Sequence, residues 1–271
     1  MIWMMTATAT AGILLALEPE VPVVDLDLPP LERRWGGDRA CDVREALAAA
    51  GEGRSKRVDL ADPQQTVADN LHVLDAWEGV RDCATVEREL DGTFDLYFSG
   101  QVLIAAARVR TDTMPGVAAN HALDAFALGN DSKAGPMVSA MVGQVLHLEA
   151  LNALEAIWPA LSEGQRVRVA TRLAELHAAD PGVDLEAERA VLAQIADAFW
   201  PVDAVCVQAH EEVMVHVERA LAAKDIGLLD ANRAQTWAGW LTPCAHGIES
   251  VMVDYLEQQA EIDGSVAAFG P

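Results

Sequence analysis

The stretch from residue 137 to residue 161 constrains the fold of this chain more than any other part of it. It contains no strong helix breaker before Pro159, and its apolar side chains occupy three rows at helical spacing. These rows are Val138, Met141, Val145 and Leu148; Val142, Leu146, Ala150, Ala153 and Ile157; and Leu151, Leu154 and Trp158. A helix that is apolar on nearly every side is either enclosed by other elements or lies in a membrane.

The acidic residues Glu149 and Glu155 decide between these two environments. They argue against a membrane, because a membrane-spanning helix needs about 20 predominantly apolar residues. We therefore predict an all-α fold, in which a multi-helix bundle of antiparallel helical hairpins surrounds a buried central helix at 137–161.

Composition supports a helical domain and excludes two classes of partner. The chain has 271 residues, of which 51% are hydrophobic, so it can bury a substantial core. Alanine and leucine, both good helix formers, are abundant. The net charge of −23 repels nucleic acid and anionic lipid surfaces, so neither is expected as a main partner. No motif implies a cofactor.

The N-terminal region has the composition of a leader followed by a spacer. Residues 1–17 are apolar and uncharged, which is typical of an export signal or membrane anchor, although the basic region of a signal peptide is missing. An ordinary buried helix is the alternative. Residues 18–37 are rich in proline and acidic residues, which favours an extended linker. We expect one helical domain over 38–271, with a possible sub-unit at 38–91, and membrane contact only through the N-terminal segment.

Caps, breakers and apolar spacing predict the helices of this domain in chain order. They are expected at 38–51, from Pro63 to about 79, and at 84–90, 94–110, 117–128, 137–161, 162–179, 184–199 and 203–224, around 234–241, and from Pro243 onward. Ser162 and Gln165 form a capping box at the start of one of these helices. The last nine residues, 263–271, are expected to fray.

The four cysteines fall into two separated pairs. None of them is spaced as C-x-x-C, which argues against zinc ribbons and thioredoxin-type sites. Under the simplest up-and-down topology Cys41 meets Cys83, and Cys206 lies at the same end of the bundle as Cys244. This arrangement predicts two disulfides, and hence a periplasmic or other extracytoplasmic location in a bacterium. Four reduced core thiols are the alternative.

Residues 94–131 contain two adjacent helical patterns, and the second ends in HALDAFALGND with Ala122 and Phe126 four residues apart. This pair resembles a degenerate tetratricopeptide-type helical hairpin. The Trp-Leu-Gly-Tyr signature of the first helix and the terminal proline are absent, and no second copy keeps the period. The resemblance implies hairpin packing and a protein-interaction role. The whole chain is also similar to uncharacterised exported helical proteins of bacteria, a likeness that names no activity.

A weak candidate metal site lies in the segment HEEVMVH. Glu212 and His216 are one helical turn apart and could share a metal ion with His210 nearby. The spacing is H-E-x-x-x-x-H and not the H-E-x-x-H that places two imidazoles on one zinc. We therefore favour an exposed, charged helix face here.

A second candidate site lies within the central helix. His147, Asn152 and Glu155 could line a polar pocket, with Glu155 as an ionisable group of raised pKa. Alternatively, the acidic residues of this helix reach arginines or the surface, and this is the interpretation that we favour.

Nucleophile elbows, Walker loops and dinucleotide-binding glycine motifs are absent from the sequence. The first functional hypothesis is therefore a non-enzymatic, envelope-associated domain that is structural or binds another protein. The alternative is an enzyme or small-ligand module with a His/Glu site between the central helix and the helix at 203–224. A solid core with an apolar groove would favour the first hypothesis. A deep pocket that joins His147 or Glu155 to His210 or His216 would favour the second.

Overall fold

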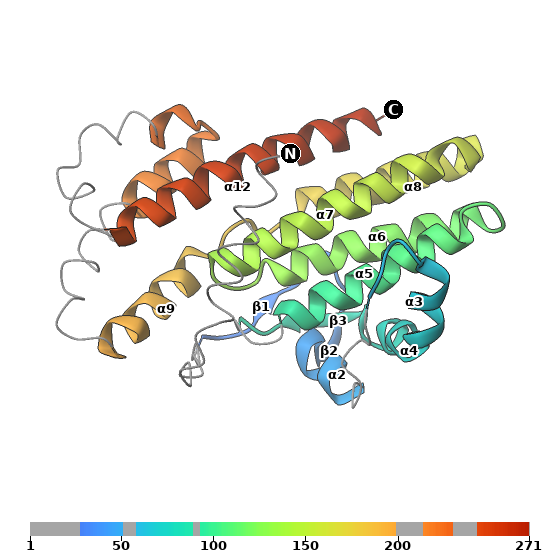
Figure 1. The fold of residues 1–271 in the computed structure, drawn as a ribbon, viewed down its shortest axis with the longest axis horizontal. Coiled ribbons are helices and arrows are strands. Elements are labelled where there is room, and N and C mark those ends of the chain that lie inside the picture. The colour runs from blue at the N-terminus through green and yellow to red at the C-terminus, as the bar shows by residue number, and fades with distance from the viewer. Residues whose placement is uncertain (1–27, 51–57, 89–92, 199–213, 230–242, 271) are drawn as a thin grey trace.

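The structure is a computed structural model that describes residues 28–50, 58–88, 93–198, 214–229 and 243–270. These residues form a mostly helical body with one small sheet (Figure 1), so the predicted all-α fold class is confirmed. The apolar leader at 1–17 and most of the linker at 18–37 lie outside the described residues.

Three consecutive helices form the centre of the molecule. They are α5 (Thr93–Arg110), α6 (Pro115–Ser132) and α7 (Met137–Ile157). Helix α6 packs along both α5 and α7, and α7 also contacts α5. The buried side chains of α7 include Leu146, Leu154 and Ile157, which belong to the main hydrophobic core. The long apolar segment predicted from sequence is therefore the central helix.

One face of α7 is more exposed than its apolar composition predicts. Val138 is 51% exposed and Val145 is 37% exposed, so α7 is not enclosed on all sides. The segment Met137–Ala160 is long and apolar enough to cross a membrane, and 61% of its most apolar window is buried inside the molecule. Packing against neighbouring helices explains most of this apolar character.

The neighbours that cover α7 differ in part from those expected. The antiparallel bundle predicted from sequence places the helices at 94–110 and 117–128, and the two helices after Pro159, against the central helix. Instead, the third main neighbour is the C-terminal helix α12 (Pro243–Ala268), whereas α8 (Glu163–Ala178) packs on α6 and α12. Helix α8 begins at the predicted capping box, where the Ser162 amide donates to Gln165 Oε1 at 2.9 Å. Further helical elements are η1 (Trp158–Ala160), α9 (Leu185–Ala198) and the segment 214–223.

The C-terminal residues are helical, so the prediction that 263–271 fray is wrong for residues 263–268. Ile262, Val266 and Phe269 recur at helical spacing, and all three belong to or pack against the main core. The Phe269 ring meets the Trp158 ring edge-on at 5.0 Å between centroids. This apolar row holds the end of α12 in place.

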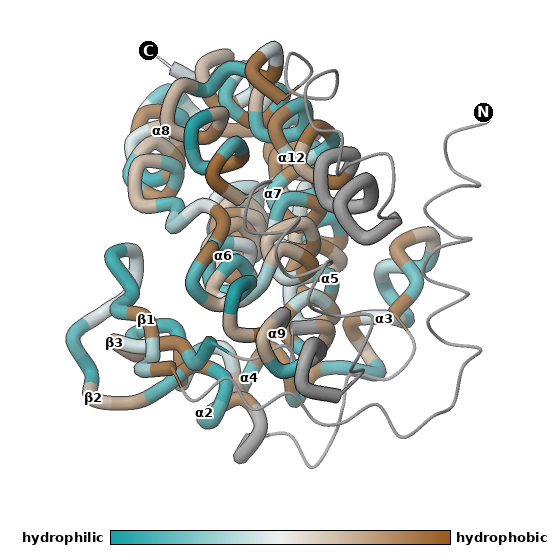
Figure 2. Tube along the Cα trace, turned by 90° about the vertical axis from the view of Figure 1, so that its left-hand side faces the viewer, coloured by the Kyte–Doolittle hydropathy of each residue, from teal (hydrophilic) through white to brown (hydrophobic). Residues whose placement is uncertain are grey.

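The N-terminal part of the described chain forms a small sheet, which the sequence did not predict. Its strands are β1 (Leu31–Glu32), β2 (Arg39–Asp42) and β3 (Cys83–Val86), in the order β1-β3-β2. Strand β3 pairs antiparallel with β1 and parallel with β2. The strands lie together on one side of the helices (Figure 2). Residues 31–35, which were assigned to the linker, therefore belong to the packed body.

The helices next to the sheet correct three predicted boundaries. The helix expected at 84–90 is replaced by β3, whose Cys83 and Val86 side chains are fully buried. The helix expected at 38–51 begins as strand β2 and continues as α2 (Val43–Ala50), because Asp42 Oδ1 accepts from the Arg44 amide at 2.8 Å. The helix from Pro63 divides at Asn70 into α3 (Pro63–Asp69) and α4 (Leu71–Val80).

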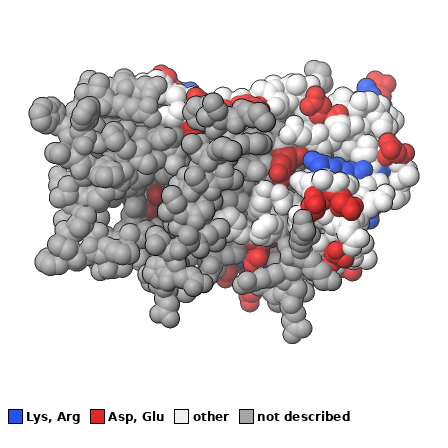
Figure 3. Space-filling model, in the orientation of Figure 1, with Lys and Arg blue, Asp and Glu red and all other residues white. Residues whose placement is uncertain are grey.

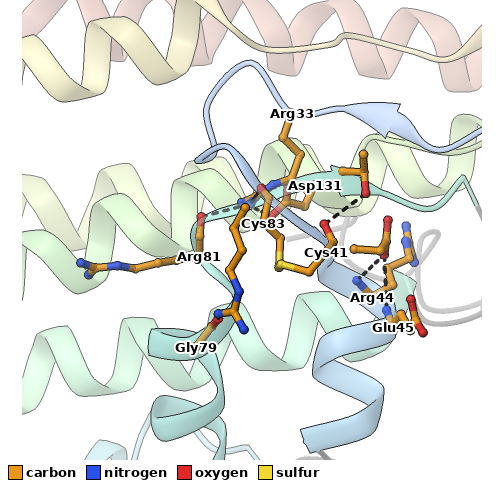
Figure 4. The surroundings of a disulfide bond; sticks show 11 residues. Arg33, Cys41, Arg44, Glu45, Gly79, Arg81, Cys83 and Asp131 are labelled. Atoms are coloured by element: carbon orange, nitrogen blue, oxygen red, sulfur yellow. Dashed lines mark hydrogen bonds and ion pairs between the residues drawn. A yellow bond between two sulfur atoms is a disulfide. The ribbon is translucent and has the colours of Figure 1, made fainter.

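The predicted disulfide between Cys41 and Cys83 is present and joins β2 to β3 (Figure 4). The two Cα atoms are 4.9 Å apart, and the bond closes a sequence separation of 42 residues. It links neighbouring strands, whereas the sequence suggested two antiparallel helices. Cys206 lies outside the described residues, as does the side chain of Cys244, so their pairing remains a prediction.

Reduction of the Cys41–Cys83 bond is expected to lower the free energy of unfolding by about 4 kcal/mol in the chain-entropy model. Urea denaturation of the oxidised protein, the reduced protein and the Cys41→Ala/Cys83→Ala variant measures this effect. In a thiol titration of the denatured but unreduced protein, at most two of the four cysteines should react. Four reactive thiols would contradict the assignment.

Candidate functional site

The C-terminal end of α6 carries the most unusual polar feature in the described chain. Its last residues and the next one form a run of four polar side chains with 0% exposure: Asn130, Asp131, Ser132 and Lys133. Buried polar groups cost free energy unless they find partners. Three of these four side chains reach other parts of the chain, and Ser132 donates within α6 to Leu128 O at 2.9 Å.

Asp131 connects α6 to the N-terminal strands. Arg33 donates to both of its carboxylate oxygens, from Nε at 2.7 Å and from Nη2 at 3.0 Å, and Trp35 Nε1 donates to Oδ1 at 2.7 Å. Arg33 Nη1 also donates to the Cys83 carbonyl at 2.6 Å, beside the disulfide (Figure 4). The two charges are therefore paired and hydrogen-bonded, which is the arrangement that makes a buried ion pair tolerable.

Lys133 connects α6 to the α8–α9 turn and to α12. Its Nζ lies 2.6 Å from Asp180 Oδ2 and 3.2 Å from Gln259 Oε1. Gln144 on α7 donates to Gln259 Oε1 at 3.3 Å, and Gln259 donates to Asp263 at 3.0 Å. We call Lys133, Gln144, His147, Asp180, Gln259 and Asp263 the polar cluster. Burial alone would raise the pKa of Asp180, but the Lys133 ammonium holds it below its ordinary value.

His147 lies at the inner edge of the polar cluster. Its ring stacks on Phe126 with centroids 3.9 Å apart, and its Nδ1 is 4.0 Å from Asp180 Oδ2. Neither ring nitrogen meets a hydrogen-bond partner of normal geometry within the described residues. Burial lowers the pKa of His147 well below its ordinary value, and Lys133 adds to this effect. Burial of His147 in the folded protein therefore disfavours its protonated form.

Close approach of α6 and α7 explains why this histidine fits. A Cβ atom added to Gly129 would lie 2.9 Å from the Gly143 carbonyl oxygen and would also collide with the His147 ring. A larger residue at Gly129 would push the two helices apart. Lys133, Gln144 and His147 are all 0% exposed, so these three side chains present no surface to a substrate. The polar cluster is built as a packing junction.

The structure separates the residues that the sequence grouped as a pocket. His147 is in the core, whereas Asn152 and Glu155 lie on the exposed side of α7. Of the weak metal candidates, His216 is partly buried on 214–223, and His210 and Glu212 lie outside the described residues. No group of three or more His, Cys, Asp or Glu side chains with metal-binding geometry occurs among the residues that the structure describes.

A groove between α6 and α8 is the feature that sequence reasoning missed. It has a volume of about 500 Å³ and is lined by Met114, by the first three turns of α6 and by α8. The lining residues, which define the α6–α8 groove, are Met114, Pro115, Gly116, Val117, Asn120, Leu123, Gln165, Arg168, Val169 and Arg172. Leu123 and Val169 are buried, whereas Met114 and Val117 are 49% and 41% exposed. The volume lies in the range of about 300–1,000 Å³ that is usual for ligand sites.

The charges of the groove differ from those of the chain as a whole. The sequence has 42 acidic residues against 19 basic ones. Acidic side chains are scattered over the visible described surface, where basic ones are few (Figure 3). Arg168 and Arg172 are nevertheless the charged members of the lining described above, which includes no acidic residue. The groove is therefore apolar with a positive edge.

Comparisons of this chain with protein-family models, curated proteins and solved structures found no match. The α6–α8 groove combines exposed apolar side chains with the exposed Arg168, which suits binding. In the polar cluster, Lys133, Gln144 and His147 are enclosed, whereas the Asp263 side chain is 33% exposed.

Substitution of Asp131 by alanine is expected to lower the free energy of unfolding by about 3–5 kcal/mol, because it leaves the Arg33 charge buried without its partner. Asp75→Ala, at an exposed position on α4, is the control and should change stability by no more than about 0.5 kcal/mol. Urea denaturation measures both. Equal effects of the two substitutions would show that the ion pair does not anchor the N-terminal strands.

The polar cluster predicts a loss of stability in mild acid. Because folding lowers the pKa of His147, the unfolded chain binds a proton at this residue more readily than the folded chain. Its contribution to stability is complete above the unfolded pKa of about 6.5 and is lost as the pH falls below that value. For one proton, the free energy of unfolding changes by up to about 1.4 kcal/mol per pH unit.

Urea denaturation between pH 7.5 and pH 5.0 tests this dependence. His147→Gln should remove this part of the slope, although the variant is less stable at neutral pH. His72→Gln on α4 is the control for the loss of one histidine. Identical pH profiles for the wild-type protein and His147→Gln would refute the role assigned to this residue.

Proposed function

We propose that this protein is a non-enzymatic binding domain that recognises a segment of another protein in the α6–α8 groove. The observation that carries the proposal is the groove itself, with Leu123 and Val169 at its floor and the exposed Met114 and Val117 at its rim. Exposed apolar side chains around a concave surface are typical of protein-recognition sites. Helical proteins commonly bind partner segments in grooves of this kind.

Catalysis has less support than binding. An enzyme needs polar groups that reach a substrate, yet the buried cluster of Lys133, His147 and Gln144 is enclosed by α6, α7 and α12. The exposed Asn152 and Glu155 lie away from that cluster. Among the residues that the structure describes, no specific observation favours the alternative of an enzyme or small-ligand site between α7 and the helix at 203–224, and residues 203–213 lie outside them.

The proposal also places the protein outside the cytoplasm, as an exported or envelope-associated domain. Its support is the Cys41–Cys83 disulfide, since such bonds persist in oxidising compartments and are rare in the cytosol. The bond stabilises the sheet that anchors the N-terminal side of the body. An interaction domain that works outside the cell benefits from a covalent link of this kind.

A photo-crosslinking residue at Val117 tests the proposal in cells that produce the protein. We expect an adduct with one protein, which can be identified by mass spectrometry, and weaker adduct formation after Met114→Glu at the groove rim. The control position is Leu71 on α4, which is also apolar and 55% exposed. Binding of the identified protein, measured with purified components, should weaken about tenfold or more in Met114→Glu.

Two results would contradict the proposed function. One is the same adducts from Val117 and Leu71, which would indicate nonspecific contact. The other is unchanged affinity of Met114→Glu for the crosslinked protein.

A further inference from the structure

We propose that the α6–α8 groove selects acidic partners, namely protein segments in which carboxylate side chains alternate with apolar ones. This inference rests on the proposed function and adds the chemistry of the bound segment to it.

The α8 wall supplies a positive charge that is free to bind. Arg168 is exposed and makes no hydrogen bond or ion pair with any residue that the structure describes. Arg172, one turn further along α8, is held in place because its guanidinium donates to the Trp35 carbonyl at 2.9 Å and to Glu175 at 3.2 Å. Arg172 is therefore fixed at the edge of the groove with its charge paired to Glu175, and Arg168 is the cation that is available for a carboxylate of the ligand.

The α6 wall has the same sign. Helix α6 is 18 residues long, and its first turn contains no acidic residue. Its N-cap residue, Met114, makes no side-chain capping hydrogen bond. The partial positive charge at a helix N-terminus favours anions, most strongly when no acidic side chain already lies there. The start of α6 and the Arg168 guanidinium thus both favour carboxylates.

The apolar residues of the groove require apolar side chains in the bound segment. Leu123 and Val169 form a buried apolar base, and Met114 and Val117 leave apolar surface exposed at the rim. A purely polar acidic segment would leave these side chains in water. A segment with both apolar and acidic side chains would cover the floor and also reach the arginines.

The net charge of the protein disfavours binding of an acidic segment outside the groove. A net charge of −23 repels acidic segments from most of the surface. At physiological ionic strength, salt screens the interaction between charges that are more than about 8 Å apart. The electrostatic potential inside the groove is therefore determined mainly by the arginines that line it. An acidic partner is therefore attracted at the groove and disfavoured elsewhere, which fixes where it binds.

A random peptide library displayed on phage, selected against the full-length folded protein, tests this inference. We expect enriched peptides to combine aspartate or glutamate with leucine, isoleucine, valine or phenylalanine. Synthetic versions of these peptides should bind Arg168→Glu about tenfold or more weakly than the wild-type protein. Arg168→Lys, which keeps the charge, should restore a large part of the affinity.

The matched control is Arg219→Glu on the segment 214–223. It makes the same change of charge at another exposed arginine, and that segment lies at the opposite end of the molecule from the start of α6 (Figure 1). Peptide affinity should be unchanged in this variant. Circular dichroism and thermal unfolding of Arg168→Glu should match the wild-type protein, because the side chain is exposed.

The possible failures of the two proposals can be told apart. Enriched peptides that are neutral or basic, but that lose affinity in Met114→Glu, would overturn the acidic selectivity and leave the proposed function intact. Selection that yields no peptide sensitive to either Met114→Glu or Arg168→Glu would overturn both.

Discussion

The pairing of buried charges at the end of α6 determines how distant parts of this chain come together. Asp131 pairs with Arg33, which precedes it by 98 residues. Lys133 pairs with Asp180, which follows it by 47 residues, and also donates to Gln259, which follows it by 126 residues. Neither charged side chain can remain buried unless its partner is present. The N-terminal strands, the α8–α9 turn and α12 must therefore all reach the same end of α6 in the folded protein.

The two ends of α6 serve different purposes. Its C-terminal end is enclosed and polar, and it fixes the packing of the body. Its N-terminal end is exposed and apolar, and it forms one wall of the groove. Because an α-helix of 18 residues is about 27 Å long and stiff, the packing junction holds the groove wall in position from a distance. The position of this groove wall is thereby set by the packing of the body.

Local patterns predicted the helical core but not the contacts that complete it. The apolar rows of 137–161 and the capping box at Ser162 gave α7 and α8 to within a few residues, because both signals lie within one element. Strand β3 was missed because its four residues become a strand only by pairing with segments more than 40 residues earlier. The pattern Ile262, Val266 and Phe269 was available in the sequence and could have predicted the ordered end of α12.

The candidate site was harder to predict for the same reason. The groove depends on two helices that are separated by all of α7, and no single segment encodes its shape. The polar run Asn130 to Lys133 is visible in the sequence at the end of an apolar helix, yet its partners cannot be read from neighbouring residues. The sequence pattern singled out His147, which is fully buried, but its helical spacing to Asn152 and Glu155 does not show that those two side chains are exposed.

The position of strand β1 has a mechanical consequence. At the N-terminal side of the packed body, Leu31 and Glu32 pair with β3, and the next residue, Arg33, forms an ion pair with Asp131. A pull on the N-terminal side of the chain is therefore resisted first by this short strand and the ion pair. The Cys41–Cys83 bond lies behind them and keeps β2 attached to β3 even if β1 detaches. Tension would thus act first on the segment that includes Trp35, whose carbonyl holds Arg172 at the edge of the groove.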